Sequence, residues 1–552
     1  MIAVIFAGVI LLCVVTWFLV VYMDPELSSI SVRIIVFLAL VASGSIVVLI
    51  PFDLELSNYN DCINEHPTHP EKCVTPSLNI PLSALSLTWK LIYWITFFLV
   101  WVFMPFVTNF SRAAEFKLSE RIVTAIKTSL RFYLILGSLS LSGIIYLFIS
   151  VGISFNGIVS LCMSLANLWG LILLVLLCGH GLVNFPRSLW RKSNYEREVK
   201  FAEFSASAVY SDLEQSKNKL SETLSKVTKV ATQVPPRNPL YHYLSKVISK
   251  CPLSAYQNST SLLNIGKGNG LGGADISYEL VCSLHKEVIM RTSSLRIHEA
   301  RWMNLVKKYS TLKTLLSVKR QRQEVGRKPL VSGNQGAVKR SIWIEIRPWF
   351  FKFLSIVLSL FSGLLLFSEI SLVSDYITSP ISLFMEAVDS AIIHSVLIMM
   401  PVGYMLMCGF YSLANVRKGK DYAVLKKLTA PWSGIFLSGF MLRIVFPLCY
   451  NFLNILKVDN TAFIAMFGPM RDLPLLGVTL NTWLPVAIVG TCFLVFFECF
   501  SSVLRVFGVN TFNHDEVNED PNLLVEGRAL LMRAKDLLAR EEGRHDIVNI
   551  CV

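Results

Sequence analysis

Two residues of opposite charge, Arg443 and Glu498, lie inside long apolar stretches of the 552-residue sequence. A charge within hydrocarbon is costly unless it is paired, so such residues are candidates for binding or moving a polar solute, or for joining two helices. Counted inward from the same side, Arg443 is about 11 residues deep and Glu498 about 9, so their depths differ by only ~3 Å along a helix. We therefore predict an intramembrane ion pair between Arg443 and Glu498.

Two cysteines, Cys62 and Cys73, could form a disulfide bond. They lie eleven residues apart in a proline-containing loop between two apolar stretches. Among the twelve cysteines, they alone fall on the non-cytosolic side of the topology derived below, where an oxidising compartment could join them. We predict that they form the only disulfide of the chain.

Other patterns that could carry chemistry lack a supporting context. Gly268, Gly270 and Gly273 satisfy G-x-G-x-x-G, but no predicted strand precedes them and no P-loop lysine follows, so a flexible linker is the better interpretation. His66 and His69 are predicted to lie in a solvated loop rather than to hold a metal. We find no hydrolase elbow, H-E-x-x-H or Cys-x-x-Cys motif, and therefore expect no enzyme activity and no cofactor.

Nine apolar stretches of about 20 or more residues position these side chains, each long enough to cross a ~30 Å hydrocarbon layer as a helix. The composition agrees, because 53% of the residues are hydrophobic and only 16% are charged. An all-α polytopic membrane protein with nine transmembrane helices is therefore predicted. The spans are placed near residues 2–22, 31–52, 84–107, 130–154, 157–183, 349–368, 386–412, 432–454 and 483–507.

The topology follows from the basic loops, because lysine and arginine near span ends are retained in the cytosol. Residues 112–127, 187–347 and 417–427 are basic, and the second of these loops carries 28 basic and 12 acidic residues. With nine spans all three lie on one side, so the N-terminus is exterior and the tail after about residue 509 is cytosolic. The net charge of +13 then fits an anionic inner leaflet and requires no nucleic acid.

The sequence is thus divided into four parts: a five-span bundle at 1–186, a cytosolic insertion at 187–347, a four-span bundle at 348–508 and a tail at 509–552. Within the insertion, two segments carry apolar residues at helical spacing, 192–232 and 280–325. They predict a helical, coiled-coil hairpin that forms a stalk beneath the membrane, although two unpaired solvated helices would fit the same pattern.

The tail also has a helical pattern. Leucines recur among basic residues from about 522 to 541, and acidic residues precede them, where the helix dipole favours negative charge. We predict an amphipathic helix whose apolar face lies on the hairpin or on the inner leaflet.

Several stretches resemble a known family. The run from Ala166 to Trp190 resembles the fifth span of the limb-region-1 domain-containing membrane proteins, a lipocalin-receptor-like family. Arg347–Lys352, Ile50–Asp53 and Ser283–Val288 are similar to its second-type member. The resemblance covers nearly the whole chain, and it implies nine spans, an exterior N-terminus, a coiled-coil cytosolic loop and non-enzymatic work.

Two functional classes remain. The resemblance implies a receptor or signalling adaptor that regulates G-protein-coupled receptor signalling at the plasma membrane, recruiting cytosolic or membrane proteins, such receptors among them, through its basic loop. The alternative is a transporter, channel or lipid-moving protein with a site near Arg443 and Glu498, because spans interrupted by glycine and proline can expose backbone to a solute. An endosomal or lysosomal membrane is the alternative location.

Overall fold

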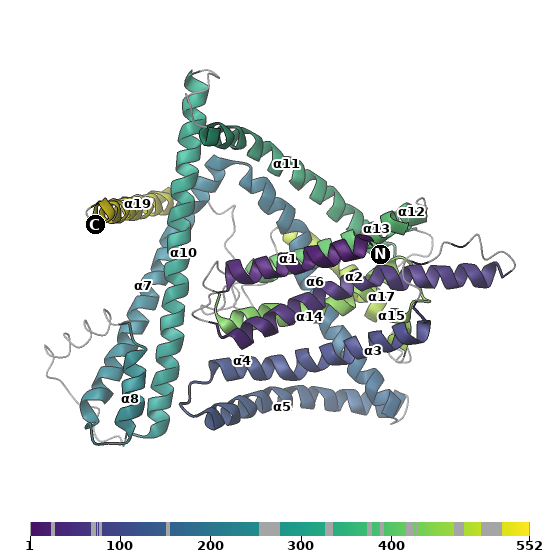
Figure 1. Cartoon of the computed structure of the whole chain (residues 1–552), viewed down its shortest axis with the longest axis horizontal. Helices are drawn as coiled ribbons and strands as arrows, with labels where there is room; N and C mark the ends of the chain where they lie inside the picture. The colour runs from purple at the N-terminus through teal and green to yellow at the C-terminus, as the bar shows by residue number, and fades with distance from the viewer. Residues whose placement is uncertain are drawn as a thin grey trace.

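The computed structural model describes residues 2–23, 28–67, 73, 76, 80–150, 155–252, 276–325, 335–372, 378–386, 391–415, 424, 429–468, 480–497 and 521–550. Within these residues the regular structure is helical, apart from one bridge between Met23 and Thr429 (Figure 1). The predicted all-α class is confirmed. The glycine-rich linker lies outside the described residues.

Seven of the described helical segments are long and apolar enough to cross a membrane, by length and composition. The two other predicted spans, 130–154 and 483–507, fall on α5 (Leu118–Ser150) and on α17 (Leu480–Phe496), which includes a shorter apolar helix. The count of nine therefore stays a prediction. The seven segments are α1 (Ile2–Tyr22), α2 (Ile30–Glu65), the continuous α3 (Leu82–Phe98), η2 (Leu99–Phe103) and α4 (Met104–Arg112), α6 (Phe155–Lys192), α11 (Gln335–Ile370), α13 (Ala391–Asn415) and α14 (Pro431–Ile455).

Helix α14 forms the centre of the bundle, packed against α2, α4, α6 and α13. Its close approach to α6 requires a glycine, because a Cβ at Gly170 would lie 2.8 Å from the carbonyl oxygen of Arg443. Helix α6 also packs against α11, α13 and α17, so it links both halves of the bundle. Two short helices, α12 (Pro380–Glu386) and α15 (Ala462–Met466), complete this part of the fold.

Beyond α6 the chain forms a hairpin of two long helices, α7 (Tyr195–Gln233) and α10 (Tyr278–Val325), with α8 (Leu240–Ser249) at its far end. The two long helices lie side by side, and the apolar stripes form their interface. In α7, for example, Leu220, Leu224 and Val227 are almost completely buried.

The hairpin does not project from the bundle as a stalk. Figure 1 shows α7 and α10 running across the ends of α1, α14, α4 and α5 rather than continuing in the direction of these helices. Contacts at both ends hold this arrangement: α7 follows α6 directly, and the far end of α10 touches the segment between α4 and α5. We call this end of the bundle the hairpin side. The periodicity predicts the pairing of the two helices, but it carries no information on the direction of the hairpin relative to the bundle.

The tail forms α19 (Pro521–Ile550), which packs on α7 and α10 near the start of α7. The helix and its position against the hairpin agree with the predicted amphipathic pattern. Leu531 is fully buried there, in a cluster that includes Ala202, Ala206 and Val306.

Candidate functional site

A π-helical turn, η2, leaves two backbone carbonyls at the level of Arg443 without a hydrogen-bond donor from their own helix. Pro105 has no N–H, so it cannot bond the carbonyl of Val100 in π register or that of Trp101 in α register. Neighbouring helices supply the missing donors: Arg443 Nη2 donates to the Val100 oxygen at 3.0 Å, and the Tyr133 hydroxyl donates to the Trp101 oxygen at 2.8 Å. Arg443 is therefore held by a backbone carbonyl, that of Val100, which is free because Pro105 has no N–H to donate to it.

Aromatic rings and a small cavity surround the Arg443 guanidinium. Its Cζ atom lies 5.0 Å from the ring centroid of Phe440 and 5.5 Å from that of Trp101, within the range of cation–π attraction. Its Nε atom is buried and has no hydrogen-bond partner among the described residues. The adjacent cavity of about 40 Å³ is lined mainly by α3, η2, α6 and α14. That space suits a few water molecules rather than an organic solute.

The predicted partner of Arg443, Glu498, lies outside the described residues, so the ion pair stays a prediction. The described part of α17 ends beside Arg187, whose Nη2 donates to the Phe496 carbonyl at 3.0 Å. Arg443 lies instead at the level of Asn167, which lines the same cavity. These two levels are about 20 residues apart along α6, or roughly 30 Å. The described contacts therefore give the pair no support.

A buried carboxylate that the sequence analysis missed, Asp53, anchors the short helix α15. Its two oxygens accept the N–H groups of Ala462 at 2.9 Å and Phe463 at 2.7 Å, the first residues of that helix. The positive end of a helix stabilises such an anion. Asp53 falls just beyond the predicted second span, where a charge usually faces water, so the sequence pattern does not indicate its burial.

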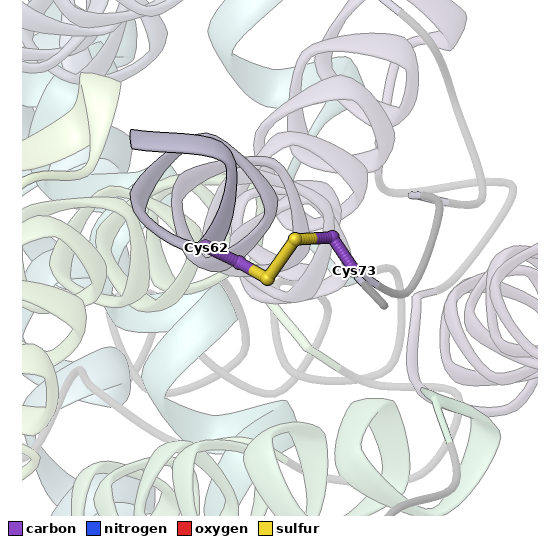
Figure 2. The surroundings of a disulfide bond; sticks show 2 residues. All are labelled: Cys62 and Cys73. Carbon is purple, nitrogen blue, oxygen red and sulfur yellow. A yellow bond between two sulfur atoms is a disulfide. The ribbon is translucent and has the colours of Figure 1, made fainter. Parts of the chain in front are cut away.

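Cys62 and Cys73 form a disulfide bond with a Cα–Cα distance of 5.9 Å (Figure 2). It ties the end of α2 to the segment that leads to α3. Eight further described cysteines are free, and five of these are buried. The bond lies at the end of α2 away from the hairpin, as the topology requires of an oxidising side.

The far end of the hairpin is docked on the segment between α4 and α5. The ring of His285 stacks on Phe116 at 4.7 Å between centroids, and its Nδ1 lies in hydrogen-bond contact with the Ala114 carbonyl. The hydroxyl of Tyr278 donates to Glu120 of α5. Burial lowers the pKa of His285, with the cations of Lys250 and Arg121 nearby, so the neutral ring is favoured. A neutral Nδ1–H donor explains the contact with Ala114.

The near end of the hairpin receives α19 through a buried carboxylate. Glu203 of α7 is 3% exposed and accepts two bonds from Arg528, at 3.0 Å from Nε and 3.1 Å from Nη2. Tyr309 of α10 donates a further hydrogen bond to Glu203 at 3.2 Å. Beside this pair, Gly527 touches the α7 backbone so closely that a Cβ would lie 1.8 Å from the Glu203 carbonyl oxygen. One carboxylate thus joins three helices.

The sequence model of the LMBR1-like membrane protein family matches residues 1–500 of this chain. The chain belongs to this family. It is accordingly an integral membrane protein, and the predicted family resemblance is confirmed. The predicted similarity to the second-type member of the family is also confirmed, because the relatives below are of that type.

The relatives include the G-protein coupled receptor-associated protein LMBRD2 of Gallus gallus, which is 25% identical over 544 residues covering 90% of this chain and 78% of the relative. The Homo sapiens protein of the same name is 24% identical over 560 residues, with the same coverage of both chains. The LMBR1 domain-containing protein 2 homolog B of Dictyostelium discoideum is 24% identical over 477 residues, 82% of this chain and 60% of the relative. No solved structure matches.

The stretches that carry the resemblance lie at contacts between elements. Ile50–Asp53 ends at the anchor of α15, and Ser283–Val288 contains the docked His285. In Arg347–Lys352, the Arg347 guanidinium lies 5.4 Å from the Tyr195 ring, and Lys352 Nζ lies 5.9 Å from the Trp190 ring. These contacts fix the start of the hairpin to α11.

Proposed function

We propose that this protein is a non-enzymatic membrane regulator that associates with G-protein-coupled receptors at the plasma membrane, with the hairpin and α19 on the cytosolic side. The names of its relatives support association with this class of receptor. The observation that carries the proposal is the placement of the hairpin, which is held at both ends across one face of the bundle. A receptor in the same bilayer presents its cytosolic face at the same depth as this hairpin, so the two surfaces can meet.

The charge of the hairpin identifies its contact element as α10. This helix carries ten basic and four acidic residues, whereas α7 carries six of each. Lys286, Arg296 and Lys307 of α10 are exposed. We infer that α10 attracts acidic cytosolic segments of partners and the anionic inner leaflet, because cations near that surface gain about 1 kcal/mol each.

The transport alternative is not favoured. The cavity at Arg443 has a volume of about 40 Å³ and is lined largely by apolar and aromatic residues. Pockets that bury organic ligands are roughly ten times larger. A space of this size does not provide a solute pathway.

Proximity labelling from a tag after α19, in cells that express a panel of tagged receptors, tests the proposal. The full chain should enrich receptors at the plasma membrane. Lys286→Glu, Arg296→Glu and Lys307→Glu together should reduce that enrichment severalfold while surface delivery stays unchanged. The matched control reverses three exposed lysines of α7: Lys200, Lys217 and Lys229. The absence of any receptor enrichment would contradict receptor association, and equal enrichment by both triple variants would contradict the role of α10.

A further inference from the structure

A further buried carboxyl group, Glu369, lies in the last turn of α11 and contacts α14. Glu369 and Asn451 are each 1% exposed, and Asn451 Nδ2 donates to Glu369 Oε1 at 2.7 Å. The predicted span 349–368 ends one residue before Glu369, so the sequence pattern does not indicate that this side chain is buried. The contact joins two helices within the bundle.

The other two oxygens of this pair are unpartnered. Glu369 Oε2 and Asn451 Oδ1 are both buried and have no hydrogen-bond partner among the described residues. Both atoms are acceptors if the carboxyl group is ionised, and an unsatisfied buried polar atom costs about 1–3 kcal/mol. The two side chains already share one hydrogen bond, so their remaining oxygens lie on neighbouring groups. Two unpartnered acceptors in this arrangement indicate that a hydrogen-bond donor between them is missing.

The surroundings of Glu369 disfavour a negative charge. No described cation forms an ion pair with it, and the titratable groups that face it are the thiols of Cys178 on α6 and Cys492 on α17. Its place in the last turn of α11 also puts it at the negative end of the helix dipole. A buried, unpaired carboxylate in this position would be strongly destabilising.

We propose that Glu369 is an intramembrane proton-binding site, in which the protonated carboxyl group donates from Oε2 to Asn451 Oδ1. One proton then satisfies both orphan oxygens. Together with the existing bond from Asn451 Nδ2, it completes a cyclic acid–amide pair with two hydrogen bonds. The bound proton thereby locks α11, the next long helix after the hairpin in the chain, to the central helix α14.

Asp53 provides a matched contrast within the same chain. It is also 1% exposed, but each of its oxygens already accepts a backbone N–H at the positive end of α15. It therefore requires no proton and is expected to be ionised. Two equally buried carboxyl groups should differ in protonation because one faces donors and the other faces an acceptor.

Infrared spectroscopy of the purified full chain at neutral pH distinguishes the two states, because a protonated carboxyl group has a C=O stretching band that a carboxylate lacks. Glu369→Gln should remove a band that shifts on exchange into D₂O, and Asp53→Asn should leave that band in place. Glu65→Gln, an exposed position at the end of α2, is the control if Asp53→Asn fails to fold.

Thermal stability gives an independent readout. Glutamine can accept from Asn451 Nδ2 and donate to Asn451 Oδ1, so Glu369→Gln should keep the unfolding temperature of the original chain. Asn451→Leu should lower it, because it leaves the buried carboxyl group without a partner. A spectrum that Glu369→Gln does not change, or a large loss of stability in that variant, would overturn the proposal.

Discussion

Replacing Gly527 with valine is expected to release α19 from the hairpin. The added Cβ would lie 1.8 Å from the Glu203 carbonyl oxygen, a backbone atom of α7 that cannot move aside without distorting that helix. Release exposes Leu531 and breaks the bonds from Arg528 to Glu203. Hydrogen bonds to charged groups contribute about 1.5–3 kcal/mol, which corresponds to roughly a tenfold to hundredfold change in the docking equilibrium.

Hydrogen exchange of the backbone amides in 521–537 measures this release. We expect faster exchange there in Gly527→Val, with no change in α14. Ala529→Val is the matched control, because it adds the same β-branched side chain at an exposed position two residues away. Equal protection of the tail in Gly527→Val and in the original chain would show that α19 is not docked through this contact.

Arg443→Leu is expected to destabilise the bundle, and Pro105→Ala is expected to restore much of the loss. The first change leaves the Val100 carbonyl buried without a donor, at a cost of about 1–3 kcal/mol, and removes the cation–π contacts. Alanine at 105 returns a backbone N–H that can satisfy that carbonyl. Thermal unfolding of the single and double variants in detergent measures the recovery.

The ion-pair hypothesis makes the opposite prediction for rescue. If Arg443 mainly neutralises Glu498, Arg443→Leu should be rescued by Glu498→Gln and not by Pro105→Ala. Pro401→Ala, which removes a proline inside α13, controls for a general gain in helix stability. Rescue by Glu498→Gln alone would refute the role that we assign to the Val100 carbonyl.

The fold could be predicted from the sequence where one helix face determines burial. The stripe at Leu213, Leu220 and Leu224 is a property of local spacing, so it identifies the buried face of α7 without a partner being known. The placement of the hairpin could not be predicted, because it depends on a contact between His285 and Ala114, which are 171 residues apart.

Buried charges were harder to predict. Counting residues gives the depth of Arg443 but not the direction of its side chain, and its described partner is a carbonyl 343 residues away that Pro105 leaves free. Asp53 and Glu369 lie at the ends of their spans, where a charge usually faces water. Their burial arises from α15 and α14, which fold over them from distant parts of the chain.

If the hairpin lies across the cytosolic face of the bundle, a photo-crosslinker at Phe116 should react with it. Replacing Phe116 with benzoylphenylalanine keeps an aromatic ring at the position that packs against Tyr243, Tyr278 and His285. Irradiation of native membranes followed by mass spectrometry should give crosslinks to peptides from 240–249 and 278–290. Crosslinks to lipid or to other proteins, with none to α8 or α10, would show that the hairpin stands away from the membrane.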